Sequence, residues 1–366
     1  MKSAIKNWLY HALPKPCARR EISLISAPVK RVLVIREGPN PSFTYYLEAR
    51  LKTLEVPFDV IENTGTVAEI DPATTFVIIC RYIRLSKFFW LWRHRAEFPG
   101  VALFIDDDIA ATVVEGHSGL GYKIYLIGLG LIPLIYLNRV LTGVWASTTV
   151  LAESLRANAI LPPFPAPDVY VQDTEGGSNS DGTCRMAFHA TGAHDAEHAF
   201  LMPIVKTALH MLPNLHFKVV AEERLAKIWR HELRDFSGRV QTISPLPWPD
   251  YLKNASHLQT DILLVPLLNG RVNNARADTK RIDASRLAAA AIFSRCKTYE
   301  RCFTEKEIMV DNDVQSWLDA IKCLVLNKDR RQEARYATSA SVIEMLRQAS
   351  PQLPGLGDFC SKRDDQ

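Results

Sequence analysis

The sequence predicts a two-domain α/β protein, and three observations lead to that prediction. The chain has 366 residues, which is more than one hydrophobic core usually serves. Short, continuously apolar segments alternate with amphipathic ones in both halves, which is typical of parallel sheets covered by helices. A polar stretch rich in glycine and serine, residues 171–184, separates the halves and has the composition of a linker.

The first half contains the segments expected to form a parallel sheet. Ser42 is placed to cap a helix whose leucines at 47, 51 and 54 share one face. The expected strands are Arg31–Ile35, Phe58–Ile61, Phe76–Cys80 and Val101–Ile105.

The second half repeats the alternation of strands and helices. Ligands of such sheets bind at the carboxyl ends of the strands, so two facing arrays predict a cleft with a binding site. The expected strands are Arg185–His189, His216–Ala221, Val240–Ile243, Asp261–Leu267 and Ile292–Ser294, and the expected helices are Ala196–Leu212, Pro249–Leu258, Ala277–Ala290 and Val314–Gln348.

These segments divide the chain into five parts. We expect a basic amino-terminal arm over residues 1–30, a first domain over 31–170 and a second over 185–345. The linker at 171–184 joins the two domains, and a tail over 346–366 follows them.

Composition excludes several classes of protein. A net charge of +4 and a pI of about 8.6 are too mild to indicate nucleic-acid binding. The seven cysteines are scattered and form no CxxC pair, which favours a reduced, cytoplasmic protein without a zinc cage. Residues 1–30 contain no continuous apolar segment of the kind found in secretory signals.

Three segments are compatible with a peripheral contact at the inner face of a membrane. Residues 1–31 carry seven lysines and arginines against one acid, together with Ile5, Trp8 and Leu9. The run Ile124–Leu137 is uncharged but short and interrupted, which favours a buried or surface-lying helix over a span. The aromatic cluster Phe88–Trp92 is expected to face mostly the core.

The first candidate site is the turn that follows strand Arg185–His189. Gly192 permits a tight turn there, and the N–H groups at the start of the next helix would attract a phosphate. His194 could add a donor to the same phosphate. The alternative is an ordinary strand-to-helix turn, and the segment does not match the G-x-G-x-x-G pattern of dinucleotide-binding enzymes.

The second candidate site follows strand Asp261–Leu267. On one continuous helix Arg276, Lys280 and Asp283 would lie within an arc of about 60°. Two cations there could hold a diphosphate, and the carboxylate could accept hydrogen bonds from sugar or ribose hydroxyls. The alternative interpretation is a solvated helix face with neighbouring charges of opposite sign.

The third candidate site is Asp106-Asp107-Asp108, at the end of strand Val101–Ile105, with His117 downstream. Asp106, Asp107 or His117 could bind acceptor hydroxyls or act as a base. Alternatively, Asp106 and Asp108 could hold a divalent metal, or Asp108 could simply cap the next helix. A further candidate is Trp248, which could stack on a nucleotide base or lie in the core.

Three stretches together resemble the GT-B glycosyltransferases of bacterial surface-polysaccharide biosynthesis, in the retaining group 1 branch. They are PGVALFIDDDI, GVWASTTVLAESL and the second-half segments AFHATGAHDAEHAFLMPIVKTALHMLPNLHFKVVAE and DILLVPLLNGRVNNARADTKRIDASRLAAAAIFS. The resemblance implies two Rossmann-like domains facing a cleft. It also implies a nucleotide-sugar donor in the second domain and a saccharide or lipid-linked acceptor in the first, with no metal or other cofactor required.

The resemblance implies specific roles for the second-half residues. Arg276 and Lys280 would bind the donor diphosphate, Asp283 the donor sugar or ribose, and the Gly192 turn would face the phosphates. The family's Glu-x7-Glu pair is absent, because Ala275 stands eight residues before Asp283. Three alternatives remain: a non-catalytic GT-B relative that binds or scaffolds, a GT-A transferase with a metal at Asp106 and Asp108, and a sugar-nucleotide epimerase on the same fold.

Overall fold

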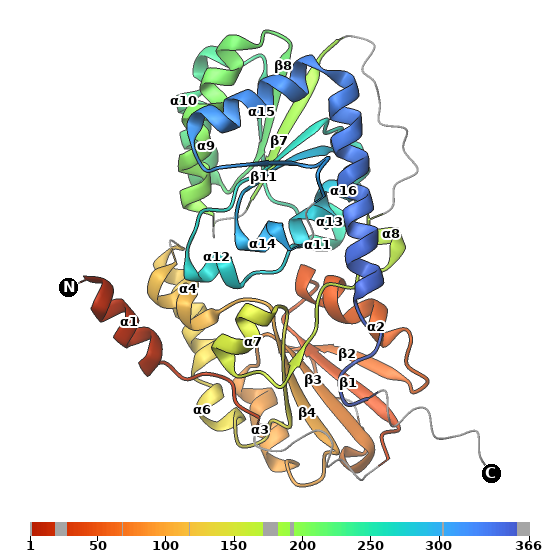
Figure 1. Cartoon of the computed structure of the whole chain (residues 1–366). Coiled ribbons are helices and arrows are strands. Elements are labelled where there is room, and N and C mark those ends of the chain that lie inside the picture. Colours follow the sequence, from red (N-terminus) through yellow and green to blue (C-terminus); the bar gives the residue numbers. More distant parts are fainter. Residues whose placement is uncertain are drawn as a thin grey trace.

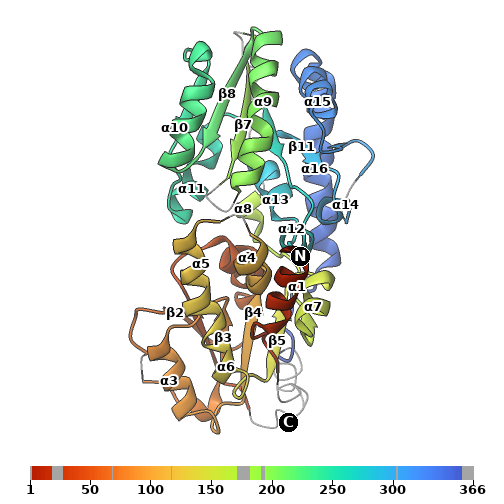
Figure 2. The same cartoon turned by 90° about the vertical axis from the view of Figure 1, so that its left-hand side faces the viewer.

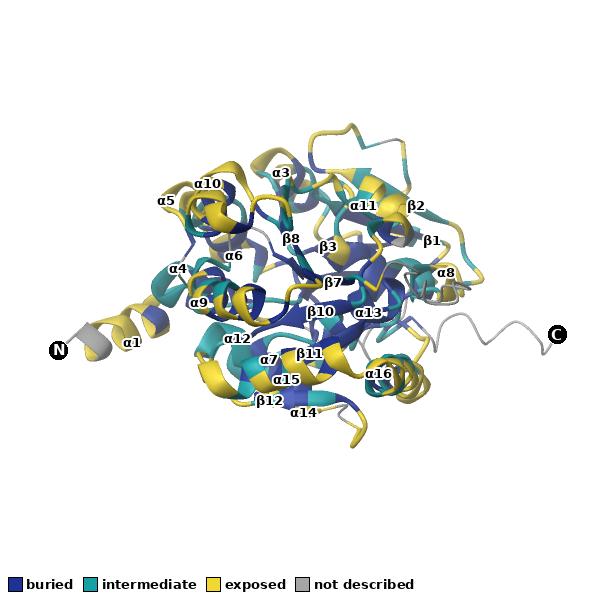
Figure 3. Cartoon of the chain, turned by 90° about the horizontal axis from the view of Figure 1, so that it is seen from above, coloured by how far each residue is buried: buried dark blue, intermediate teal, exposed yellow. Residues whose placement is uncertain are grey.

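The computed structural model describes residues 2–18, 28–67, 69–116, 118–170, 182–190, 194–301 and 304–356. These residues form two parallel, six-stranded sheets, one in each half of the chain, with helices packed around them (Figure 1). The predicted fold class is therefore confirmed. Seen from above, the strands β7, β10 and β11 are buried while the surrounding helices carry the exposed surface (Figure 3).

The first sheet has the strand order β2-β1-β3-β4-β5-β6. Every strand pairing in it is parallel. The order reverses direction between β1 and β3, which is where open α/β sheets bind ligands. Its strands are β1 (Arg31–Arg36), β2 (Phe58–Glu62), β3 (Thr75–Cys80), β4 (Gly100–Ile105), β5 (Gly143–Ala146) and β6 (Ala159–Ile160).

The second sheet has the strand order β12-β11-β10-β7-β8-β9, again with parallel pairings. This is the doubly wound arrangement of dinucleotide-binding domains, with its reversal between β7 and β10. Its strands are β7 (Cys184–His189), β8 (Leu215–Val220), β9 (Val240–Ile243), β10 (Ile262–Val265), β11 (Ala290–Ser294) and β12 (Ile308–Val310).

The helices cover both faces of each sheet. Those of the first half are α1 (Lys2–Ala12), the π-helical turn η2 (Phe43–Glu48) with α2 (Ala49–Leu51), α3 (Leu85–Arg93), α4 (Ile109–Glu115), α5 (Leu120–Leu126), α6 (Leu134–Leu137), α7 (Thr149–Leu155) and α8 (Pro167–Tyr170). Those of the second half are α9 (Asp195–Met211), α10 (Glu223–Glu232), α11 (Trp248–Asn254), α12 (Arg271–Ala275), α13 (Thr279–Arg286), α14 (Lys297–Glu300), α15 (Val314–Leu326) and α16 (Lys328–Gln348).

Two local predictions about helices are wrong. The Ser42 side chain does not cap the helical turn η2. Asn40 Oδ1 accepts the Phe43 N–H at 2.9 Å instead, and the Ser42 hydroxyl donates to Asp106. The helix expected over Ala277–Ala290 is shorter, since α12 ends at Ala275 and α13 begins at Thr279. Arg276 lies between them in extended backbone, so it does not share a helix face with Lys280 and Asp283.

The carboxyl-terminal end of the described chain returns to the first domain. Helix α16 runs down the side of the molecule (Figure 1), and Val342, Met345, Leu353 and Leu356 pack in one core cluster with residues of β1 and β3. The buried Arg50 fixes this crossing, because its Nε donates to Ser350 O at 2.9 Å and its Nη1 to Pro162 O at 2.9 Å. One guanidinium thus holds both the segment that leaves the first domain and the segment that returns to it.

The apolar segment Leu120–Leu137 lies along the first domain. It is long and apolar enough to cross a membrane by length and composition alone, with a mean hydropathy of 1.7. Leu126, Leu131, Leu134 and Leu137 nevertheless pack into the core of the first domain. Within this segment α5 and α6 therefore each have a buried face and an exposed apolar face.

Candidate functional site

The candidate site lies where the carboxyl ends of both sheets approach each other across the domain interface. Asp107, directly after β4, forms an ion pair with Arg276 of the second domain, at 3.1 Å from Oδ1 to Nε. Arg81, directly after β3, contacts the same carboxylate through Nη2 at 3.0 Å. Burial raises the pKa of Asp107, but Arg276 and Arg81 outweigh that effect and hold the pKa below its ordinary value.

Asp106 has different surroundings from Asp107. It pairs with Arg81 Nε at 3.0 Å and accepts the Ser42 hydroxyl at 2.5 Å. Burial raises the pKa of Asp106 more than Arg81 lowers it. Of the two carboxylates, Asp106 is therefore the more easily protonated, and it is better suited than Asp107 to accept a proton near neutral pH.

Asp108 has a structural role in the first turn of α4. Its Oδ1 accepts the Ala111 N–H at 2.9 Å, and its Oδ2 accepts the Tyr10 hydroxyl at 2.8 Å. Asp106 and Asp108 therefore bind separate partners, and no cluster of three metal-ligating side chains occurs among the described residues. The GT-A alternative, which requires one central sheet and this metal pair, is wrong because the protein has two sheets.

Lys280 and Asp283 lie on α13 and belong to one hydrogen-bonded network. Lys280 Nζ donates to the Asp283 carboxylate at 3.2 Å and to the His189 carbonyl, at the end of β7, at 3.3 Å. Asp283 also accepts from Arg286 at 3.1 Å and from the Tyr45 hydroxyl of the first domain. Burial raises the pKa of Asp283, but the opposing effects of Lys280 and Arg286 are larger together. The pKa is therefore below its ordinary value, and the carboxylate is charged.

His194, at the start of α9, lies between the Arg276 guanidinium and the Glu197 carboxylate. Arg276 Nη1 lies 3.3 Å from His194 Nε2, and the Glu197 carboxylate lies 3.6 Å from Nδ1. Burial lowers the pKa of His194, Glu197 opposes that effect, and Arg276 adds to it, so the pKa lies below its ordinary value and the ring is neutral near pH 7. A neutral His194 adds no charge, and its single N–H lies on Nδ1, toward Glu197, while Nε2 accepts from Arg276. The ring would donate to a phosphate only by turning away from Glu197.

Trp248 lies half-buried at the domain interface. Its indole N–H donates to Thr44 Oγ1 at 3.0 Å, and its ring stacks on Tyr251 with centroids 5.5 Å apart. Tyr45 meets the same indole edge to face, with centroids 5.3 Å apart. Trp248 therefore helps to join the two domains, and its role toward a nucleotide base remains a prediction. His117 and Gly192 lie outside the described residues.

Four residues of the site were not predicted from the sequence: Arg81, Tyr45, Arg286 and Glu197. Arg81 had a signal, since it directly follows a buried strand at the edge where ligands bind. In the structure Arg81 also has a positive φ of 69°, as do Arg156, Gln259 and Ala288, a conformation that is uncommon in residues with a side chain. Tyr45 had no sequence signal, because its partners Asp283 and Arg286 lie more than two hundred residues away in the chain. Arg286 had a local one, since it stands three residues after Asp283 on α13.

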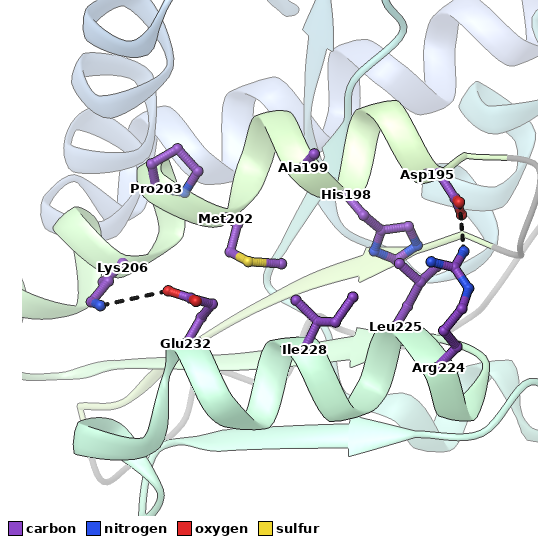
Figure 4. Close-up of a pocket in the computed structure, with 10 residues that line it drawn as sticks. All are labelled: Asp195, His198, Ala199, Met202, Pro203, Lys206, Arg224, Leu225, Ile228 and Glu232. Atoms are coloured by element: carbon purple, nitrogen blue, oxygen red, sulfur yellow. Dashed lines mark hydrogen bonds and ion pairs between the residues drawn. The ribbon is translucent and has the colours of Figure 1, made fainter. Parts of the chain in front are cut away.

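Two cavities bear on where a ligand could bind. One of about 330 Å³ opens beside Arg81, where the first sheet reverses its strand order, and is lined by Glu37, Asn40, Tyr82, Tyr122 and Tyr125 among others. Another, of about 430 Å³, runs between α9 and α10, with Met202, Leu225 and Ile228 on its walls (Figure 4). Of the predicted site residues that the structure describes, none lines the second cavity.

Comparison with known proteins identifies the fold. No protein-family profile and no curated protein sequence matches the chain. Among solved structures, a glycosyltransferase from Rickettsia africae matches 92% of this chain and 100% of its own, with a TM-score of 0.58 and 11% identity. HepE of Anabaena, in complex with UDP-glucose, matches 91% of this chain and 100% of its own, with a TM-score of 0.56 and 10% identity.

A third structure shares the fold over part of its length. TarM of S. aureus matches 77% of this chain, which spans about half, 53%, of TarM, with a TM-score of 0.51 and 10% identity. At these identities the likeness is one of fold. The chain therefore has the GT-B fold of these glycosyltransferases, with two Rossmann-like domains facing each other, as its sequence motifs predict.

Proposed function

We propose that the protein is a glycosyltransferase that moves a sugar from a nucleotide-sugar donor to a saccharide or lipid-linked acceptor. The observation that supports this most is the placement of Arg276 and Lys280 beside the reversal point of the second sheet. Arg276 pairs there with Asp107 of the first domain, and Lys280 contacts the His189 carbonyl at the end of β7. The structure of HepE with UDP-glucose supports the donor class, because its fold is similar over nearly the whole chain.

The second domain would supply the donor site. Arg276 and Lys280 would neutralise the diphosphate as it leaves, and His194 and the Gly192 turn would add N–H donors. Asp283 would accept hydrogen bonds from the donor sugar or ribose, and Trp248 would frame the base. Holding donor and acceptor together would provide much of the rate enhancement, and neither a metal nor another cofactor is needed in this proposal.

The first domain would supply the acceptor site. Asp106 would accept the proton of the attacking hydroxyl, since its pKa is raised while Asp107 is held between two guanidiniums. The cavity beside Arg81, with its tyrosines and Glu37, would hold the acceptor. His117 stays a candidate for the same site on its sequence position alone.

We also propose that the protein works on the cytoplasmic side of the membrane. The resemblance to enzymes of surface-polysaccharide biosynthesis favours a role in building the cell envelope, from the cytoplasmic side of the membrane. Five cysteines are free in the described part of the chain, which is compatible with a reducing compartment.

Nucleotide profiling tests the proposed function. We expect UDP, GDP or ADP to raise the melting temperature of the protein at millimolar concentration, to the same extent with manganese and with EDTA. Binding that appears only with manganese would contradict the metal-free scheme, and no shift with any of the three nucleotides would contradict the donor site itself.

One observation favours a second candidate, a GT-B relative that binds nucleotide sugars without transferring them. Ala275 stands where the family has a glutamate, and its carbonyl accepts the Thr148 hydroxyl at 2.8 Å across the interface. The two candidates differ in turnover. The enzyme releases nucleoside diphosphate from its donor when acceptor is supplied, whereas the binding protein protects the donor and releases none.

A further inference from the structure

Helix α1 has two faces of opposite character. Its outer face exposes Ile5, Trp8 and Leu9, whose exposed fractions are 52%, 68% and 41%. Large apolar side chains grouped in this way on one short helix indicate a contact surface. Its inner side chain Tyr10 is 3% exposed and lies in the core of the first domain.

The inner face of α1 contacts the site region of the first domain. The Tyr10 hydroxyl donates to Asp108 at 2.8 Å, one residue from Asp107. The Tyr10 ring also lies 4.0 Å from Lys15 Nζ and 4.0 Å from the Arg271 guanidinium, as centroid distances. A cation over the face of an aromatic ring is attracted to it. Tyr10 therefore connects Asp108 of the first domain with Lys15 and with Arg271.

Arg271 brings the second domain into this contact. It begins α12, the helix that ends next to Arg276. Its Nη2 donates to Asn7 Oδ1 of α1 at 2.9 Å, and its Nε lies 3.5 Å from Glu115 at the end of α4. Helix α1 is therefore anchored in the first domain through Tyr10 and is contacted by the second domain through Arg271.

The outer surface of this side of the molecule is basic and apolar. No acid occurs in residues 1–20, 72–96 or 116–152, which include α1, α3, α5 and α6. Figure 2 shows α1, α4, α5 and α6 together on this side of the first domain. Helices α5 and α6 expose Leu120, Ile124, Ile135 and Tyr136. Ile132 is exposed between the two helices, and Arg139 just after α6.

This combination fits an anionic lipid surface. Apolar side chains on an interfacial helix enter the boundary of the acyl chains, while lysines and arginines meet the phosphates of the headgroups. Lys6 lies on the exposed part of α1, and the segments that contain α1, α5 and α6 carry no acid that would repel an anionic bilayer. The acid of α4 on this side, Glu115, is paired with Arg271.

We propose that α1 docks on an anionic bilayer and couples that docking to the approach of the two domains through Tyr10 and Arg271. A bilayer that holds α1 in place stabilises the arrangement in which Arg271 contacts it. By linkage, the closed arrangement of the domains then strengthens binding to the bilayer. The proposal does not depend on the transfer reaction, and neither of its readouts uses a nucleotide.

Vesicle sedimentation tests the docking surface. Wild-type protein is expected to bind vesicles of equal parts phosphatidylglycerol and phosphatidylcholine at least tenfold more tightly than vesicles of phosphatidylcholine alone. Trp8→Glu is expected to weaken binding to the anionic vesicles about tenfold. The control is Leu326→Glu on α15, where the replaced leucine is 63% exposed in the second domain. Equal binding by wild type and Trp8→Glu, or equal loss in the control, overturns the docking surface.

Hydrogen exchange tests the coupling. In wild type, anionic vesicles are expected to slow the exchange of the α12 amides about fivefold, because docking of α1 holds Arg271. In Arg271→Ala the vesicles still bind, but the slowing disappears. Exchange in wild type that vesicles do not change, or slowing that persists in Arg271→Ala, overturns the coupling through Arg271.

Discussion

Lys280→Ala is expected to weaken the binding of UDP, or of whichever nucleoside diphosphate the protein prefers, by roughly 10- to 150-fold. This corresponds to the loss of one charge-assisted phosphate contact, about 1.5–3 kcal/mol. The fold should survive the change, because Asp283 keeps its contacts with Arg286 and Tyr45. Isothermal titration of both proteins with the nucleotide, in the presence of EDTA, measures the difference.

The matched control for Lys280 is Lys322, an exposed lysine on α15 of the same domain. Lys322→Ala removes the same charge and should leave the affinity unchanged. If both substitutions weaken binding equally, the effect is one of total charge, and if neither does, Lys280 does not bind the diphosphate.

Arg281→Met is expected to lower the free energy of unfolding by about 3–5 kcal/mol, the usual cost of removing one partner from a buried ion pair. Arg281 is fully buried on α13 and pairs with Asp278 and with Glu307, the latter at 2.8 Å from Nε to Oε1. Removal of the guanidinium leaves both carboxylates buried without a cation. Urea denaturation followed by circular dichroism measures the loss.

A second ion pair provides the comparison for Arg281. Arg295 and Asp311 are 3.0 Å apart, but half or more of each side chain is exposed. Arg295→Met should change the unfolding free energy by less than about 1 kcal/mol, since exposed pairs contribute little. A loss in Arg281→Met no larger than that in Arg295→Met would contradict the assigned role of Arg281 in holding α13, and with it Lys280, in place.

The strands of both sheets could be predicted because burial on two faces produces continuous apolar runs such as those of β1 and β10. The strands β5, β6 and β12 were missed, and each has four residues or fewer. Helix α10 was missed as well, although it has 10 residues and Leu225 and Trp229 show helical spacing. The short strands could not be predicted because tertiary contacts stabilise them, whereas the pattern of α10 was present in the sequence.

The candidate site was predicted less completely than the fold. Arg276 and Lys280 were singled out as neighbours on one helix, whereas they reach the same region from extended backbone and from α13. The partner of Arg276 could not be predicted, because Asp107 is 169 residues away in the chain. Only the packing of the two domains brings such residues together, and no local pattern encodes it.

A crystal structure with bound UDP tests the central claim most directly. The account predicts diphosphate oxygens within hydrogen-bonding distance of Lys280 Nζ and the Arg276 guanidinium, between the carboxyl ends of β7 and β10 and the first domain. Density for UDP at any other place, or side chains of Arg276 and Lys280 that both leave the diphosphate without contact, would contradict it.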